Sequence, residues 1–350
     1  MSFRISCLTM LLAYVLQCSF HSDLVVGVGN LEKWPDRAHS IQWILESDLP
    51  VSRYIIVDSV GSVDFKTVQS AVDVVPINNP EWVYIQINAG LYREKVVIPY
   101  NKPNIIFQGA GRENTVITWG EAADADGSTA DSATFSSFAS NFIAKGIGFK
   151  NSAPPAPPGV NGKQAVAALV AGDMTAFYEC GFYGAQDTLF DYQGRHYFKN
   201  CYIEGSIDFI FGHGQSTYKE CELYAIAQGQ KIPGAISAQN RASPEESSGF
   251  IFIACKISGS GQVFLGRAWG AYSRVIYAYT YMENIIVPQG WDDWGLVQRH
   301  RSVEYGQYKC YGLGANTTDR VKWSQELTNQ EVQPFLDLSF INGLEWLHEF

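Results

Sequence analysis

The chain has 350 residues and a formal net charge of −10, with 46% hydrophobic and 17% charged residues. This composition allows a large core and excludes a mainly disordered chain, and the negative charge argues against nucleic acid as a partner. The length suits one large domain or two ordinary ones. Aromatic residues reach 14%, which fits both sugar recognition and a large β core.

The N-terminus is predicted to be a secretory signal covering residues 1–22. Arg4 is the only charged residue before Asp23, and Ile5–Leu16 is an apolar run too short to span a bilayer comfortably. No later segment of the sequence is long and apolar enough to do so. We therefore expect a secreted protein without a membrane anchor, in which residues 23–52 form a short lead-in to the main domain.

Two short helices are predicted in a chain otherwise rich in β-forming runs. Residues Asp64–Val75 carry an apolar stripe at helical spacing. Thr328 and Glu331 form a capping-box pattern before a second helix, which Pro334 should keep short. Strands are predicted for short β-branched and aromatic runs between them, such as Val83–Ile87, Ile105–Phe107, Val116–Trp119, Ile251–Ile253 and Val275–Tyr279.

Cysteines mark a repeat of about 20 residues. Similar β-rich stretches contain Cys180, Cys201 and Cys221, with steps of 21 and 20 residues, and a longer step to Cys255 that an inserted loop would explain. A period of this size without an intervening helix predicts a β-solenoid. Cysteine would fill a repeated inward position as a small hydrophobe. Five cysteines follow the signal, so at least one thiol is unpaired within the chain, and their spacing indicates ladder positions more than a disulfide framework.

The predicted fold is all-β, a single-domain parallel β-helix over residues 53–350. The open ends of a solenoid need covers. We predict that the helix at Asp64–Val75 caps the N-terminal end and that the C-terminal segment covers the other end. No linker divides the chain, and the prolines within Ala153–Gly159 are interpreted as a rigid loop between coils.

The repeat places two acidic residues in register. Asp187 lies seven residues after Cys180, and Asp208 lies seven after Cys201. Equivalent positions on adjacent turns stack about 4.8 Å apart, so one carboxyl pKa should rise while the other stays low. Such a pair can supply a nucleophile and a proton donor. The alternative, two turn residues that face solvent, stays open on this evidence alone.

Five motifs, in chain order, resemble those of the plant pectin methylesterase family. They are Gly90–Glu94, Gln164–Ala167, Gly184–Phe190 with Gln-Asp-Thr-Leu, Ser206–Gly212 with Asp-Phe-Ile-Phe-Gly, and Leu265–Trp269 with Leu-Gly-Arg-Ala-Trp. The likeness runs from about Ile55 to Trp346. It implies a right-handed parallel β-helix that hydrolyses the methyl esters of cell-wall pectin, homogalacturonan, and releases methanol.

The resemblance also implies catalytic roles. Asp208 would be the nucleophile that forms an acyl-enzyme, and Asp187 the proton donor and later general base. Gln164 and Gln186 would donate hydrogen bonds to the oxyanion, as amides can without titrating. Arg267 would orient Asp208 and keep it ionised, so it should lie nearer to Asp208 than to Asp187.

Further residues matched by the resemblance would bind substrate or carry glycan. Thr129 and Trp269 would contact the sugar, together with Gln164 and Arg267, and no metal or cofactor is implied. His213 stands where the family usually has Asn, and we interpret it as a hydrogen-bonded neutral loop residue. Asn316 begins an Asn-Thr-Thr acceptor pattern for N-glycosylation.

The expected partner is the pectin polysaccharide. The resemblance also offers a proteinaceous pectinesterase inhibitor as a candidate protein partner. We expect a monomer in the cell wall that contacts neither nucleic acid nor, after signal removal, a membrane. Three alternatives stay open. Carboxylates about 5 Å apart also suit retaining glycoside hydrolysis, a pectate lyase would need an acidic calcium cluster, and a wall-binding protein with an inactive site would need no chemistry.

Overall fold

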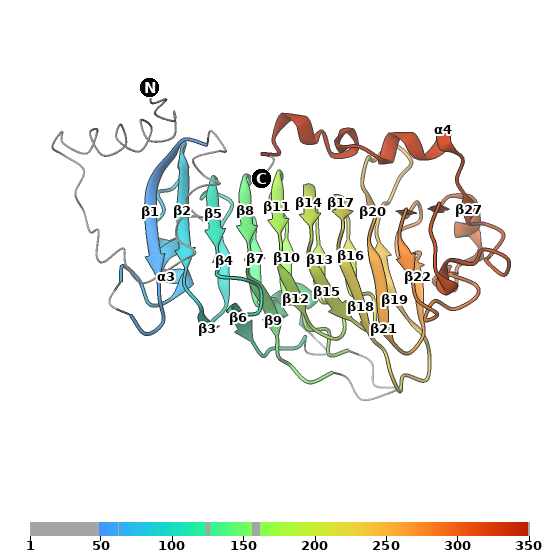
Figure 1. The fold of residues 1–350 in the computed structure, drawn as a ribbon, viewed down its shortest axis with the longest axis horizontal. Helices are drawn as coiled ribbons and strands as arrows, with labels where there is room; N and C mark the ends of the chain where they lie inside the picture. The colour runs from blue at the N-terminus through green and yellow to red at the C-terminus, as the bar shows by residue number, and fades with distance from the viewer. Residues whose placement is uncertain (1–48, 62, 124–126, 156–161, 349–350) are drawn as a thin grey trace, which may run out of the picture. The chain divides into compact units, whose positions relative to one another are not determined.

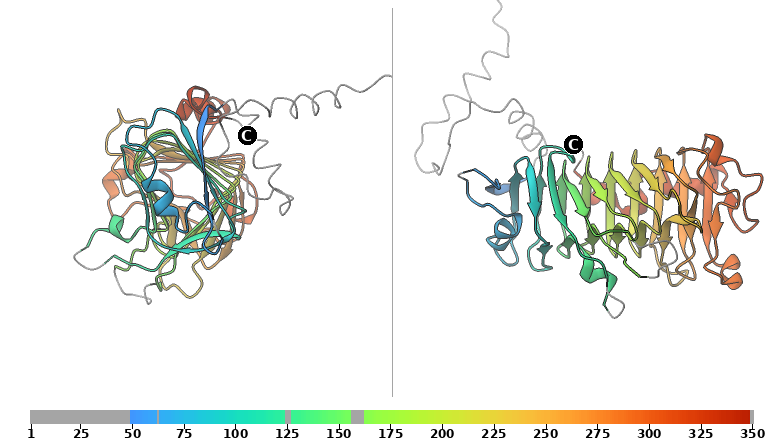
Figure 2. Two further views of the ribbon diagram at one scale, coloured as in Figure 1. Left: turned by 90° about the vertical axis from the view of Figure 1, so that its left-hand side faces the viewer. Right: turned by 90° about the horizontal axis from the view of Figure 1, so that it is seen from below.

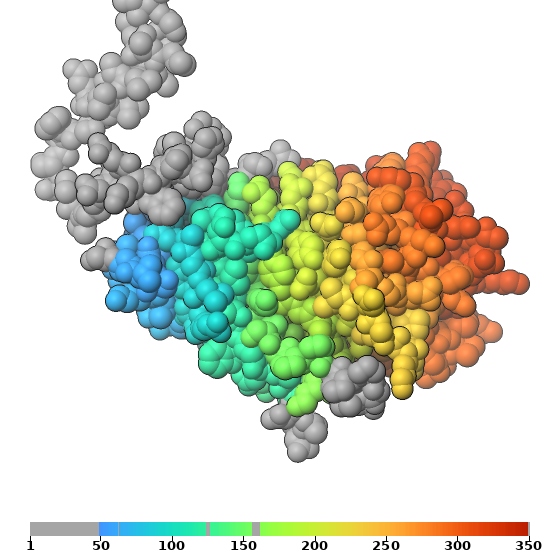
Figure 3. Space-filling model, turned by 60° about the horizontal axis from the view of Figure 1, so that its bottom comes forward, coloured from blue at the N-terminus to red at the C-terminus, as the bar shows by residue number. Residues whose placement is uncertain are grey.

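The computed structural model describes residues 49–348, except for residue 62, residues 124–126 and residues 156–161. The predicted signal at 1–22 and most of the lead-in at 23–52 lie outside the described residues. Figure 1 shows short strands stacked side by side in successive coils, the predicted right-handed parallel β-helix. The coils follow one another along the molecule in chain order (Figure 3). Within the described ranges, no helix is long and apolar enough to cross a membrane.

The coils form three parallel sheets, here called A, B and C. Sheet A contains β1 (Val51–Val57), β2 (Trp82–Ile87), β5 (Ile105–Gln108), β8 (Phe142–Lys145), β11 (Thr175–Tyr178), β14 (Arg195–Lys199), β17 (Gln215–Lys219), β20 (Gly249–Ile253), β23 (Arg274–Ala278), β26 (Glu304–Tyr308) and β27 (Gln325–Glu326). Sheet B contains β3 (Gly90–Arg93), β6 (Thr115–Trp119), β9 (Gly148–Asn151), β12 (Gly181–Tyr183), β15 (Tyr202–Gly205), β18 (Glu222–Ile226), β21 (Lys256–Ser260) and β24 (Tyr281–Met282). Sheet C contains β4 (Val96–Ile98), β7 (Phe135–Ser137), β10 (Ala168–Val170), β13 (Leu189–Asp191), β16 (Ile210–Gly212), β19 (Gly234–Gln239), β22 (Val263–Arg267) and β25 (Trp291–Asp292).

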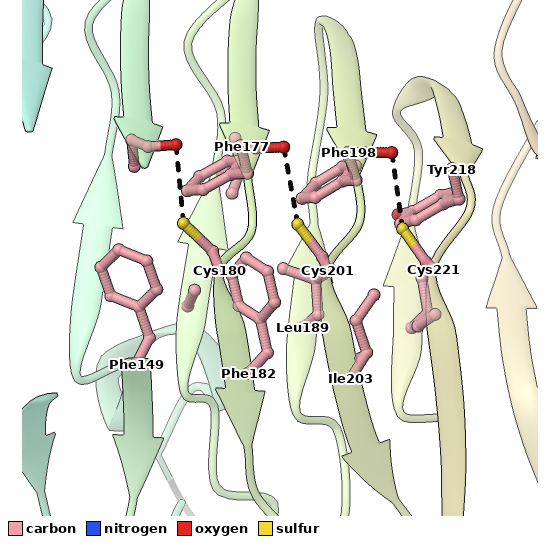
Figure 4. Close-up of a cluster of buried hydrophobic side chains, with 14 of the residues drawn as sticks. Phe149, Phe177, Cys180, Phe182, Leu189, Phe198, Cys201, Ile203, Tyr218 and Cys221 are labelled. Carbon is pink, nitrogen blue, oxygen red and sulfur yellow. Dashed lines mark hydrogen bonds between the residues drawn. The ribbon is translucent and has the colours of Figure 1, made fainter. Parts of the chain in front are cut away.

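The predicted cysteine ladder lies at the turn from sheet A to sheet B (Figure 4). Cys180, Cys201 and Cys221 are fully or almost fully buried free thiols. Each donates a weak hydrogen bond to a carbonyl oxygen of the preceding coil, for example from Cys201 Sγ to Phe177 O at 3.5 Å. Burial raises the pKa of the Cys180 thiol well above its usual range. These cysteines therefore act as small core residues in a repeated turn.

Stacked rings fill the interior next to this ladder. Phe177 and Phe198 stack with centroids 5.1 Å apart, and Phe198 and Tyr218 with centroids 4.6 Å apart. Because adjacent coils pair in register, each inward position of one strand meets the same position of the next. Like side chains consequently pack on like side chains along the helix.

The N-terminal end carries α3 (Val68–Asp73), which is shorter than the predicted helix at Asp64–Val75. Thr67 caps it by accepting the Ser70 N–H, and residues before the cap are extended because Phe65 forms a parallel bridge with Val57. Phe65, the first residue of the apolar stripe, is therefore paired as a strand residue and is not part of the helix. The end-on view in Figure 2 shows this helix across the opening of the coils.

The C-terminal segment contains α4 (Asn329–Val332), with the predicted capping box between Thr328 and Glu331. It covers the outer face of sheet A instead of the open end, as Figure 1 shows. Phe335 packs there in a cluster with Ile251 and Ile276. The segment continues back along the sheet, where Gln215 Nε2 donates to a carbonyl oxygen of its last turns. Hydrophobic side chains on this face give the segment an apolar surface to bury.

Short 3-10 helices complete the described structure. They are η2 (Thr129–Ser132), η3 (Val297–Arg301), η4 (Leu313–Ala315), η5 (Gln333–Phe335), η6 (Leu338–Ile341) and η7 (Gly343–Glu345). Pro334 lies in η5 directly after α4, which agrees with the prediction that it keeps the second helix short.

Candidate active site

A cleft of about 840 Å³ lies on the outer side of sheet C. Its walls come from several consecutive coils and from the loops between them. It contains every residue predicted for catalysis or substrate binding: Thr129, Gln164, Gln186, Asp187, Asp208, Arg267 and Trp269. Residues far apart in the sequence are thus collected in one cavity, as expected for a binding site.

Asp187 and Asp208 occupy equivalent positions on neighbouring coils. Leu189 pairs with Ile210 in the same register, 21 residues apart, and each aspartate lies two residues before that pair. Both aspartates have left-handed backbone, with φ of 59° for Asp187 and 46° for Asp208. Aspartate, like asparagine, adopts this otherwise uncommon conformation more readily than most residues, and its recurrence shows that one turn geometry presents both carboxyl groups. Both are turn residues, as the alternative had it, but they line the cleft and are half-buried (Asp187) or buried (Asp208), so they do not face open solvent.

Arg267 reaches Asp208 from β22, two coils further along. Its Nε lies 3.4 Å from Asp208 Oδ1, an ion pair with the aspartate predicted for it. The two atoms are buried, and neither forms a hydrogen bond with another described residue. Because buried polar atoms are normally hydrogen-bonded, a free carboxylate oxygen beside a free N–H indicates a place where a ligand completes the site.

The two carboxyl groups have different protonation behaviour. Burial raises the pKa of Asp187 well above its usual range, the charge of Asp208 raises it further, and Arg267 opposes both. Burial also raises the pKa of Asp208, to about 6, although Arg267 pulls it down. The expectation that one pKa stays low was wrong, because desolvation outweighs the single ion pair. The expected order is retained, with Asp208 the stronger acid.

Two amide side chains lie beside the aspartates. Gln186 directly precedes Asp187, and its carbonyl oxygen accepts the N–H of Ala165 at 3.1 Å, which ties the coil of Gln164 to that of Gln186. Neither amide side chain has a hydrogen bond to a residue within the described ranges. Both can therefore donate to a ligand in the cleft.

Aromatic rings form one wall of the cleft. Phe190 and Phe211 stack with centroids 4.2 Å apart, and Phe211 lies 6.1 Å from the Trp269 ring. Phe190 and Phe211 follow the two aspartates at the same offset of three residues, a signal in the sequence that could have identified this stacked pair. Trp294 also lines the cleft, whereas Trp291 is core.

The loop from β18 to β19 forms another part of the cleft. Lys231 and Ile232 in this loop line the cavity and are exposed. The long step between Cys221 and Cys255 indicates an inserted loop, but nothing in the sequence indicates that it borders the cleft. Loop paths depend on contacts that a short sequence window does not contain.

His213 and Asn316 lie outside the cleft lining. His213 Nδ1 lies 2.7 Å from the Asn240 carbonyl oxygen, and its Nε2 lies 3.1 Å from Glu246 Oε2. Asn316 is exposed, and its Oδ1 accepts the Thr318 N–H at 3.0 Å. Over the described residues, no group of three or more His, Cys, Asp or Glu is placed to hold a metal ion.

Comparison with known proteins gives the family. A sequence profile described as Pectinesterase matches residues 54–344. The chain belongs to the pectinesterase family. Probable pectinesterase 67 of Arabidopsis thaliana is 44% identical over 305 residues, covering 87% of this chain and 88% of that protein. Probable pectinesterase 8 of the same plant is 47% identical over 305 residues, covering 86% of this chain and 78% of that protein.

A solved structure agrees in fold with this assignment. Pectin methylesterase from carrot superposes with a TM-score of 0.78 at 34% identity, covering 84% of this chain and 94% of that one. Pectinesterases are carboxylic ester hydrolases, and the cleft described above is the corresponding candidate active site of this chain.

Proposed function

We propose that this pectinesterase demethylates pectin through a covalent intermediate on Asp208. The observation that carries the proposal is the buried Asp208 Oδ1, which faces Arg267 Nε inside the cleft without a hydrogen bond from the described residues. A carboxylate held in this way is desolvated and incompletely satisfied, so it is available to attack an electrophile.

The first half of the reaction forms the acyl-enzyme. Asp208, as a carboxylate, attacks the ester carbonyl carbon of a methylated galacturonate, and negative charge develops on the carbonyl oxygen. The amides of Gln164 and Gln186 would donate hydrogen bonds to this oxygen. Collapse breaks the bond to the methoxy group, and the proton of Asp187 passes to the departing oxygen to give methanol.

The second half releases the product. Asp187, now a carboxylate, takes a proton from a water molecule, whose oxygen attacks the acyl carbon. The bond to Asp208 breaks, so that Asp208 regains its charge, Asp187 its proton, and the sugar a free carboxyl group. Arg267 stabilises Asp208 each time it is anionic. The raised pKa of Asp187 favours its protonated form at the start of each cycle.

The walls of the cleft suit a methylated polyuronate. We propose that Trp269 and the Phe190–Phe211 pair pack against sugar rings and the ester methyl group, since flat apolar rings match the apolar faces of sugars. Thr129, which also lines the cleft, would contact the same chain. The partner is thus neutral, esterified pectin, which does not repel a protein of net charge −10.

The setting of the enzyme is also a proposal. The signal pattern at residues 1–22 supports secretion to the cell wall, and the exposed Asn316 supports N-glycosylation there. A monomeric state and binding of a proteinaceous inhibitor remain expectations from the family resemblance. Removal of N-linked glycan from the secreted chain should lower its mass, and Asn316→Gln should abolish that change.

One assay separates the esterase from its rivals. The purified chain is incubated with esterified pectin, and methanol, new reducing ends and unsaturated products are measured together. We expect methanol alone. Reducing ends without methanol would identify a glycoside hydrolase, unsaturated products a lyase, and no product at all a binding protein.

A further inference from the structure

A third carboxylate approaches the catalytic arginine. Arg267 pairs in register with Asp292 of β25, the next coil. Asp292 Oδ1 lies 4.0 Å from Arg267 Nε, the same nitrogen that lies 3.4 Å from Asp208 Oδ1. Asp292 does not line the cleft, so it can act on Asp208 only through Arg267 and through its charge.

Asp292 also builds the turn that holds the guanidinium group. Its Oδ1 accepts the Trp294 N–H at 3.0 Å, and this bond supports the left-handed backbone of Trp294, with φ of 63°. A bulky residue rarely adopts that conformation without such support. The Trp294 ring then lies 4.1 Å from Arg267 Cζ in a cation–π contact.

We propose that Asp292 is a positioning residue that sets the pH at which this enzyme becomes active, because it shares the charge of Arg267 with Asp208. The inference rests on the proposed function of Asp208 as nucleophile. With one guanidinium between two carboxylates, each receives less stabilisation than it would alone. The charges act on Asp208 in the directions that this sharing requires: Arg267 lowers the pKa of Asp208, and Asp292 raises it.

Other ionisable groups face Asp208 from every neighbouring element. They are Asp187 from the preceding coil, Arg267 from β22, Asp292 from β25, Tyr305 from β26 and Lys231 from the β18–β19 loop, which lines the same cleft. Tyr305 is buried and its pKa is raised, so it stays neutral in the working range. Asp187 is protonated there for the reason given above. Lys231 is exposed to solvent, which screens its charge, so Arg267 and Asp292 are the charges that decide when Asp208 ionises.

The size of the effect follows from the distance. Both carboxylates lie within 4.0 Å of one nitrogen, so they are no more than about 7.5 Å apart. At this separation a unit charge shifts a neighbouring pKa by about 0.5 to 1.5 units, depending on the effective dielectric constant. Removal of the Asp292 charge should lower the pKa of Asp208 by that amount.

The test compares Asp292→Asn with Asp293→Asn. Both variants lose one negative charge and keep an oxygen that can accept the turn N–H, but the Asp293 carboxylate faces His300, at 2.8 Å, instead of Arg267. The measurement is methanol release from esterified pectin as kcat/KM against pH. Asp292→Asn should move the acidic limb to lower pH by about half a unit or more, whereas Asp293→Asn should leave it where the wild type has it.

A third variant separates charge from turn geometry. Asp292→Ala loses the acceptor for the Trp294 N–H as well, so we expect the same shift together with a fall in kcat/KM of about tenfold, on the scale of a misplaced positioning group. An acidic limb that does not move in Asp292→Asn, or moves equally in Asp293→Asn, would overturn the inference.

The inference and the proposed function fail separately. Asp208→Asn, measured in the same assay, tests the nucleophile. An inactive Asp208→Asn beside an unshifted Asp292→Asn would reject the role of Asp292 alone. An active Asp208→Asn would reject the nucleophile, and the role of Asp292 with it.

Discussion

The two aspartates with the same offset in the repeat have different surroundings, and the roles proposed for them depend on that difference. Asp187 and Asp208 share a turn, a backbone conformation and a burial cost, so the residue type alone does not distinguish them. Two contacts distinguish them: Arg267 lies 3.4 Å from Asp208, and the charge of Asp208 raises the pKa of Asp187 further. We propose that this cation, two coils further along, helps to separate the proton donor from the nucleophile.

Replacement of the nucleophile by its amide tests this assignment. Asp208→Asn keeps the shape of the side chain but cannot attack a carbonyl as an anion. We expect kcat for methanol release to fall to less than about a hundredth of the wild-type value, with an unchanged circular dichroism spectrum. A folded variant with more activity than this would show that the nucleophile is another residue.

The pH dependence of the free enzyme reports the same pair. The proposed mechanism requires Asp208 ionised and Asp187 protonated, so kcat/KM should rise with pH as Asp208 loses its proton, near pH 6. It should fall at higher pH as Asp187 loses its proton, since that pKa lies well above its usual range. The two limbs belong to the coupled pair. A profile that is flat from pH 5 to pH 9 would contradict the assignment.

At the scale of the element, one turn is repeated along the solenoid. The residue before each ladder cysteine has left-handed backbone, with φ of 55° at Asn200, 57° at Glu220 and 52° at Ala254. Asparagine adopts this conformation more readily than alanine, because its short polar side chain can form local hydrogen bonds. Ala254 is exposed and its N–H still donates to the next coil, at 2.9 Å to Ala278 O. Its side chain therefore contributes strain without packing.

This strain can be relieved by substitution. Ala254→Asn should increase the free energy of unfolding by about 0.5–1 kcal/mol, because asparagine is more stable in left-handed backbone. Ala254→Val is the matched control and should decrease it by about 1 kcal/mol or more, since a β-branched residue is a strong outlier there. Urea unfolding followed by tryptophan fluorescence measures both. Equal stability of the two variants would show that the turn carries no strain.

The sequence predicts those parts of this structure that repeat. The spacing of Cys180 and Cys201 is enough to place Asp187 against Asp208, because the same 21-residue step separates both pairs. The contact of Arg267 with Asp208 was expected only from the family resemblance, and two other features that depend on long-range structure were not predicted. The bridge from Phe65 to Val57 shortens the first helix, and burial, which no local pattern contains, raises the pKa of Asp208.

At the scale of the whole molecule, the described residues place the candidate active site and the covering C-terminal segment on different faces of the solenoid. The cleft lies on sheet C, while the C-terminal segment covers sheet A and its apolar outer residues. In a solenoid each coil contacts mainly its neighbours, so a segment laid across several coils adds contacts that stacking alone does not provide. Substitutions that remove packing on sheet A should therefore leave the geometry of the cleft on sheet C unchanged.

Phe335 tests this separation of faces. It is 8% exposed and packs with Ile251, Ile276 and Leu327 in the cluster under the segment. Phe335→Ala should lower the free energy of unfolding by about 2–4 kcal/mol, through lost burial and the cavity left behind. Below the unfolding transition kcat/KM for methanol release should stay within about twofold of wild type, because additivity holds for distant sites.

Leu344→Ala is the control, since this residue of the same segment is 88% exposed and its loss should change stability by less than about 0.5 kcal/mol. A parallel loss of activity and stability in Phe335→Ala would mean that the segment over sheet A also holds the cleft in shape.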